Sequence, residues 1–167
     1  MALVKDGQAV QDPWINVADN VELPSSGPII VSLARWQTDR DALSSRADPV
    51  GIRLASHEAA SDIASGLNRI SLVALEFPTF RDGRAYSTAR LLRERYGFTG
   101  ELRAVGNVLY DQLMFMHRCG FDAFEIASDE AVESWQKAMS EFSAWYQPAT
   151  DRRTPVTALR HLRRAAE

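Results

Sequence analysis

The residues of this chain that could bind a charged group gather in one short segment. Arg81 and Arg84 flank Gly83, and Arg90 follows within the same helical pattern. Arginine presents a rigid fork of N–H donors that matches carboxylates, phosphates and other oxyanions. The segment lies between an apolar run typical of a strand and a helical pattern, and helix N-termini favour anions. We therefore predict an oxyanion- or partner-binding loop here, formed by Arg81, Asp82, Gly83, Arg84, Tyr86, Ser87 and Arg90.

Asp111 and Gln112, near the start of the next predicted helix, are further candidates for the same surface. In this interpretation the arginines supply charge, Asp82 and the glycine set the turn, and the hydroxyl groups donate hydrogen bonds. An alternative is a structural turn, in which Asp82 caps the helix and the arginines form surface ion pairs with Glu76 and Glu94. Asp111 and Gln112 could equally well be exposed polar residues of an ordinary helix.

Motifs that would name a reaction are absent from the sequence. There is no Gly-x-Gly-x-x-Gly, no Gly-Lys-Ser/Thr phosphate loop and no Cys-x-x-Cys. His57, His117 and His161 lack the spacing of metal ligands, so we expect no metal site and no bound cofactor. With a single cysteine, an iron–sulfur cluster held by four thiolates is excluded. That residue, Cys119, fits a packing role better than that of a nucleophile.

Composition places the chain among ordinary globular proteins. Hydrophobic residues make up 46% and charged residues 25% of the 167 positions, which is enough for one core. The single cysteine, and first residues that hold a charge and a turn rather than a signal peptide, lead us to expect a cytoplasmic protein. No apolar run approaches the length of a membrane span. The net charge of −3 argues against a general nucleic-acid binder.

Apolar runs of strand length alternate with helical patterns along most of the chain. We predict a hairpin over residues 2–17, strands over 29–33, 51–55, 70–77, 101–105 and 121–127, and helices over 34–46, 58–67, 85–96, 108–119 and 129–145. This pattern indicates an α/β fold with a mainly parallel sheet of about five strands covered by helices on both faces. The sheet is either open and doubly wound or a partial barrel. We favour the open sheet, because five β/α units fall short of a closed eight-stranded barrel.

Residues 1–146 form a single α/β domain in this interpretation. Residues 147–167 then make a polar linker and a basic amphipathic helix that begins near Thr154 and Pro155. The apolar stripe of this helix and the arginines beside it are Val156, Leu159 and Leu162 with Arg160, Arg163 and Arg164. The segment is either a docking helix or a frayed terminus.

Four blocks in the middle of the chain, residues 80–93, 100–106, 111–112 and 118–122, form a recognisable set. They are Phe-Arg-Asp-Gly-Arg-Ala-Tyr-Ser-Thr-Ala-Arg-Leu-Leu-Arg, Gly-Glu-Leu-Arg-Ala-Val-Gly, Asp-Gln and Arg-Cys-Gly-Phe-Asp. In these blocks the chain resembles the bacterial domain-of-unknown-function 934 family, which is linked to sulfite reduction. The resemblance covers roughly residues 25–145.

The resemblance implies a role beside the sulfite reductase haemoprotein in assimilatory sulfur metabolism. We expect an accessory protein that is not itself a redox enzyme, and whose arginine loop binds a small oxyanion or the acidic face of that partner. One alternative is a small α/β enzyme acting on an anionic sulfur or phosphate compound, with Glu76 as general base. Another is a structural homo-oligomer joined through the C-terminal helix.

Overall fold

The computed structural model describes residues 2–128, 130–151 and 153–165, with side chains as far as Arg160. Its sheet has eight strands: β1 (Ala2–Lys5), β2 (Gln8–Val10), β3 (Ile15–Asn16), β4 (Ile29–Ser32), β5 (Val50–Leu54), β6 (Ile70–Phe77), β7 (Glu101–Gly106) and β8 (Ala123–Ile126). The α-helices are α1 (Leu33–Thr38), α2 (Arg40–Ser44), α3 (Arg84–Arg90), α4 (Tyr110–Arg118), α5 (Ala131–Ser140) and α6 (Val156–Ala165). Two 3-10 helices, η1 (Ala60–Asp62) and η2 (Ala64–Arg69), precede β6, and a π-helical segment, η3 (Leu91–Arg95), continues α3.

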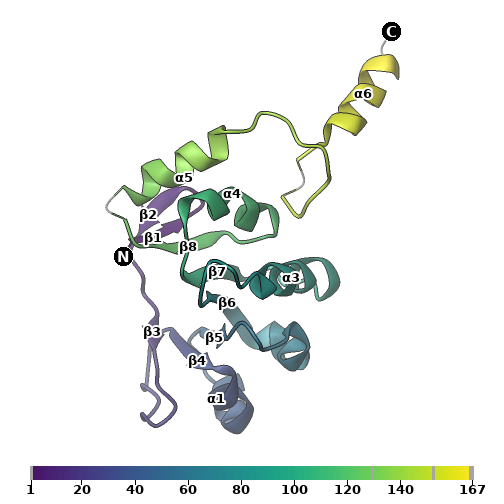
Figure 1. The fold of residues 1–167 in the computed structure, drawn as a ribbon. Coiled ribbons are helices and arrows are strands. Elements are labelled where there is room, and N and C mark those ends of the chain that lie inside the picture. The colour runs from purple at the N-terminus through teal and green to yellow at the C-terminus, as the bar shows by residue number, and fades with distance from the viewer. Residues whose placement is uncertain (1, 129, 152, 166–167) are drawn as a thin grey trace.

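The strand order is β2-β1-β8-β7-β6-β5-β4-β3, and the strands from β3 to β8 run parallel in sequential order. Right-handed crossovers between sequential neighbours place every connecting helix on the same face of the sheet. The helices therefore cover one face only, and the sheet curls as half of a barrel around the opposite, concave face (Figure 1).

The predicted α/β class is confirmed, but the predicted sheet was too small and its preferred form was wrong. β3 and the antiparallel strands β1 and β2 extend the five predicted strands at both edges. The preferred doubly wound sheet, with helices on both faces, is replaced by the half-barrel. Apolar strand runs identify strands buried on both sides but carry no information about strand order, and the order decides which face the helices cover.

The β1–β2 hairpin lies within the predicted range, and its turn residues Asp6 and Gly7 adopt positive φ angles of 50° and 80°. The predicted hairpin was too long, however. Residues 11–14, here called the strap, leave β2 and cross the concave face to β3 at the opposite edge of the sheet (Figure 1). Trp14 of the strap packs against a small concave cluster that consists of Ile30, Leu72, Ala74 and Val105.

The main core lies between the sheet and its helices and takes the alternate residue of each strand, such as Val73, Leu75 and Phe77 of β6. At the start of α1 the Ser32 hydroxyl accepts a hydrogen bond from the backbone N–H of Arg35, at 3.0 Å. Gly97, with a φ of 65°, follows the end of the α3–η3 helix, in agreement with the predicted helix over residues 85–96.

The helices depart from their predicted bounds in three places. Residues 34–46 divide into α1 and α2, residues 58–67 form 3-10 helices, and α5 ends at Ser140 rather than near Trp145. The helix α6 begins close to the predicted start and leads away from the rest of the molecule (Figure 1). Leu162 of its predicted apolar stripe, together with Arg163 and Arg164 beside that stripe, lies outside the described side chains. Within the described residues, no helix combines the length and the apolar character that crossing a membrane requires.

Candidate functional site

The loop between β6 and α3 holds most of the predicted site residues, and an internal ion pair braces it. Arg84 donates to Asp82 from Nε at 2.9 Å and from Nη2 at 2.6 Å, and Nη2 also donates to the Ser56 hydroxyl at 3.0 Å. The hydrogen bonds that Asp82 accepts from the Arg84 guanidinium, and after them the Ser56 hydroxyl, hold the pKa of the Asp82 carboxyl well below its usual range. The same pair raises the pKa of Arg84. Arg84 thus ties the loop to the segment after β5 and has its charge matched within the chain.

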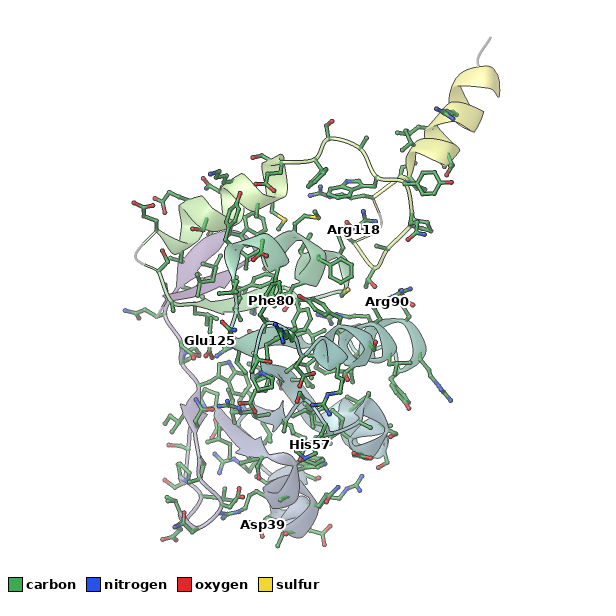
Figure 2. The ribbon with its side chains drawn as sticks, in the orientation of Figure 1. Asp39, His57, Phe80, Arg90, Arg118 and Glu125 are labelled. Atoms are coloured by element: carbon green, nitrogen blue, oxygen red, sulfur yellow. The ribbon has the colours of Figure 1, made fainter. Side chains whose placement is uncertain are left out.

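Arg90 lies apart from this pair. It is six residues beyond Arg84, which corresponds to a rise of about 9 Å and a rotation of about 120° around the helix. Its guanidinium pairs with Glu94 at 3.1 Å in an exposed (i,i+4) arrangement. Figure 2 shows Arg90 out along α3, away from Phe80 in the loop. The three predicted arginines therefore do not converge on one anion.

The two predicted hydroxyl residues differ in their surroundings. The ring of Tyr86 lies between Phe77, at a centroid distance of 5.0 Å, and Phe115, at 4.8 Å. Burial raises the pKa of Tyr86 to about 12. Tyr86 therefore packs α3 against β6 and α4 in the manner of a core residue, whereas Ser87 is exposed.

Asp111 and Gln112 do not act together at the start of α4. Gln112 is buried, and its side-chain carbonyl accepts a hydrogen bond from the backbone N–H of Leu109 at 3.3 Å. This bond satisfies a free donor at the helix N-terminus, so Gln112 is a capping residue and not part of a binding surface. Asp111 is exposed in the same turn.

Two of the exposed residues of the loop, Phe80 and Arg81, are here called the loop tip. Phe80 is 54% exposed, and Arg81 is exposed as well. Arg81 forms no ion pair within the described residues, whereas Arg84 and Arg90 both have acidic partners. Together, the loop tip residues offer an aromatic ring and a positive charge that has no acidic partner among the described residues.

A cleft on the concave face was not predicted. Its volume is about 510 Å3, and it lies at the carboxyl ends of β3, β4, β5 and β6. Its polar lining includes Asp19, Ser32, Arg53, Glu58 and Glu76. Arg53 of β5 and Glu76 of β6, both in its lining, form an ion pair of 3.0 Å. Ligands of parallel α/β sheets bind outside the carboxyl ends of the strands, so this cleft has the expected location of a ligand site.

A family model described as "Bacterial protein of unknown function (DUF934)" matches residues 51–157, which is more than half of the chain. The chain belongs to this family. The family model therefore confirms the resemblance deduced from residues 80–122. No curated protein matches the chain.

The DUF934 match begins in β5 and ends in the first turn of α6. It contains the β6–α3 loop, together with Arg53 and Glu76. Two segments that complete the cleft lie before the matched residues. They are the segment after β3 that contains Asp19 and the end of β4 with Ser32.

Within the matched DUF934 residues, Arg93 is a structural centre that the sequence did not reveal. Its guanidinium donates to the backbone carbonyls of Phe98, Gly100 and Gly120 at 2.7, 2.8 and 3.0 Å, and to Asp122 at 2.8 Å. The Asp122 carboxylate also accepts from the backbone N–H of Leu102 at 2.8 Å. This arrangement joins the end of the α3–η3 helix to the loops that enter β7 and β8.

Cys119 lies close to this centre and is buried. Burial raises the pKa of its thiol to about 11. A thiol in this environment remains protonated at neutral pH, in agreement with the packing role expected from the sequence.

Proposed function

We propose that the protein is an accessory component of assimilatory sulfite reduction that binds the sulfite reductase haemoprotein through its loop tip. The pathway follows from the family resemblance. The observation that carries the binding surface is the exposure of Phe80 beside Arg81, whose charge has no acidic partner in the part of the chain that the structure describes. Aromatic and arginine side chains are the residue types that dominate the energy of protein interfaces.

The geometry favours a protein partner over a small oxyanion at this loop. An oxyanion cradle needs several donors that converge on one point, but Arg84 and Arg90 are each paired within the chain. α3 itself spans only seven residues before the helix changes to π-type hydrogen bonding. An exposed aromatic residue next to an arginine that forms no ion pair with any described residue suits an acidic, partly apolar face of a partner.

A growth experiment tests the pathway. A host that lacks the gene is expected to grow poorly on sulfate or sulfite as the sulfur source and normally on cysteine, because cysteine bypasses sulfite reduction. Equal growth on all three sources would remove the assignment.

A binding experiment tests the surface, with the purified haemoprotein immobilised and this protein as analyte. Phe80→Ser and Arg81→Glu are each expected to weaken binding at least tenfold, and higher salt should weaken the binding of the unaltered protein. Arg95→Glu is the matched control, because Arg95 is an exposed arginine at the far end of the same helix. An equal loss for Arg95→Glu would indicate a general effect of charge and would refute the loop tip as the contact.

A further inference from the structure

The cleft at the carboxyl ends of β3 to β6 has the properties of a site for a small molecule. Its volume of about 510 Å3 falls within the usual range for pockets that bind metabolites and cofactors. Residues from several neighbouring strands contribute side chains, which is the arrangement that parallel α/β sheets use for their ligands. The cleft is also separate from the loop tip, whose residues do not line it.

The sheet register brings the central pair of the cleft together. Arg53 lies opposite Ser32 on β4 and Ala74 on β6, with its side chain on the concave face. Glu76 follows Ala74 by two residues and therefore points to the same face. The side chains of Arg53 and Glu76 remain 45% and 31% exposed, so both are accessible from the cleft.

The pair leaves hydrogen-bonding groups open. Within the described residues, Arg53 donates one side-chain hydrogen bond, from Nη2 to Glu76, and its Nε and Nη1 groups have no protein acceptor. These groups form a donor fork suited to a carboxylate. Glu76 uses one oxygen for this bond, which leaves the other oxygen available as an acceptor.

The remaining charges of the cleft are acidic. Asp19 accepts a hydrogen bond from the Ser32 hydroxyl at 2.6 Å, and Glu58 accepts one from the backbone N–H of Ala55 at 2.7 Å. Each carboxylate has a second oxygen that is open to further donors. With Asp19, Glu58 and Glu76 against Arg53, the cleft has an excess of negative charge. A ligand that neutralises this negative charge carries a cation. An acceptor group on the same ligand would bind the free donor fork of Arg53.

We propose that this cleft binds a small amino-acid-like zwitterion, with its carboxylate at Arg53 and its ammonium group among the carboxylates of Glu76, Asp19 and Glu58. A simple anion would meet three carboxylates, and a simple amine would leave the Arg53 fork unsatisfied. The site is independent of haemoprotein binding.

The test is a titration of the 15N-labelled protein, observed by two-dimensional NMR, with each of the twenty proteinogenic L-amino acids. Sodium sulfate, sodium sulfite, sodium acetate and ethylammonium chloride serve as single-charge probes. At least one amino acid is expected to shift the amide signals of Ser32 and Ala55 and the Nε–H signal of Arg53 in a saturable manner. The single-charge probes are expected to bind at least tenfold more weakly.

Variants decide whether the shifts come from the proposed contacts. Arg53→Gln and Glu76→Gln should each weaken the binding of that amino acid at least tenfold. Arg90→Gln and Glu94→Gln are the matched controls, since Arg90 and Glu94 form an exposed ion pair of similar length, 3.1 Å, on α3. The proposal is overturned if no amino acid shifts these signals, if sulfate or sulfite binds as tightly, or if both pairs of variants behave alike. Haemoprotein binding should be unchanged in Arg53→Gln, so the two proposals can fail separately.

Discussion

Arg103 on β7 and Asp12 in the strap are 91 residues apart in the sequence, and their side chains form an ion pair of 2.7 Å. Arg103 is fully buried and also bonds to Glu101 at 2.8 Å and Glu125 at 3.4 Å. Figure 2 shows Glu125 on the side of the sheet away from Arg90 and Arg118, which is the concave side. Burial alone would lower the pKa of Arg103, but the carboxylates around it outweigh burial and raise it. The guanidinium therefore remains charged and holds the strap against the sheet.

Replacing Arg103 should destabilise the whole fold. In Arg103→Met, the carboxylates of Asp12, Glu101 and Glu125 lose the guanidinium, although Lys5 still pairs with Glu101 at 2.8 Å. The loss of these charge-assisted hydrogen bonds should cost about 2 kcal/mol or more. Urea unfolding of the variant, compared with the unaltered protein, measures this loss. Arg103→Lys is the control that keeps the charge and should lose less. A loss below about 1 kcal/mol for Arg103→Met would show that the network is not a stabilising centre.

Replacing Asp12 should have a local effect instead. Asp12 is partly exposed, so Asp12→Asn loses an ion pair without leaving a fully buried charge unpaired. The strap and β3 should then open more often. The backbone N–H of Ile15, bonded to the Pro28 carbonyl at 3.1 Å, and that of Val17, bonded to the Ile30 carbonyl at 2.9 Å, are the reporters. Their hydrogen exchange should become faster, while exchange in β6 remains unchanged. Unchanged exchange at both reporters would contradict the role of Asp12.

Cys119 should be nearly inert in the folded protein. Its pKa of about 11, against about 8.5 for an unperturbed thiol, leaves at least a hundredfold less thiolate at pH 8. We therefore expect iodoacetamide to alkylate the folded protein at least about a hundredfold more slowly than the urea-unfolded chain, with the rate rising as the pH approaches the raised pKa. Mass spectrometry of timed samples measures the ratio. Similar rates in the two states would show that the thiol is accessible and ionised.

Removing the thiol should matter little. Cys119→Ala deletes one small buried group and should cost about 1 kcal/mol, without loss of growth on sulfate. A folded Cys119→Ala protein that failed to restore growth would point to a thiol mechanism.

The sequence predicted local features well and long-range ones poorly. Residues 70–77 form β6 with the predicted bounds, because eight residues dominated by apolar side chains and followed by Pro78 specify a buried strand. Arg53 was missed because, between Ile52 and Leu54, it resembles any outward-facing residue of a strand. Its partner Glu76 lies on a strand that only the sheet order brings alongside. The strap was not predicted for the same reason, because Arg103, the ion-pair partner of its Asp12, lies on β7, far away in the sequence.

The β6–α3 loop was located correctly, but the partners of its arginines were not. The alternative of surface pairs was right for Arg90 and Glu94, which are four residues apart on one helix. It was wrong for Glu76, which binds Arg53. Asp82 binds the guanidinium of Arg84, and it also accepts a hydrogen bond from the backbone N–H of Arg84 at 3.3 Å, as a cap at the start of α3 would, although Gly83 holds the N-cap position. Pairing over such short distances depends on side-chain rotamers, which a residue pattern does not determine.

Two glycines at the edge of the sheet should respond to alanine in opposite ways. Gly106 ends β7 with a φ of +91°, and a Cβ atom there would lie 2.6 Å from the carbonyl oxygen of Phe77. Gly83, in the candidate loop, has a φ of −94°, and a Cβ atom there would meet nothing closer than Tyr86 at 3.5 Å. Alanine readily adopts the negative φ of Gly83 but not the positive φ of Gly106.

Gly106→Ala is therefore expected to lose about 2 kcal/mol or more, from the strained φ and the collision with rigid backbone. Gly83→Ala should be neutral or should gain up to about 1 kcal/mol, because alanine restricts the unfolded chain at a position that it fits. Chemical denaturation of the two variants beside the unaltered protein gives both values. A marked loss for Gly83→Ala would mean that the loop requires a flexible glycine, and it would restore the conformational role that the sequence first suggested for Gly83. A neutral Gly106→Ala would instead show that the turn between β7 and α4 relaxes around a side chain, and the close approach of Gly106 to Phe77 would then not be a structural requirement.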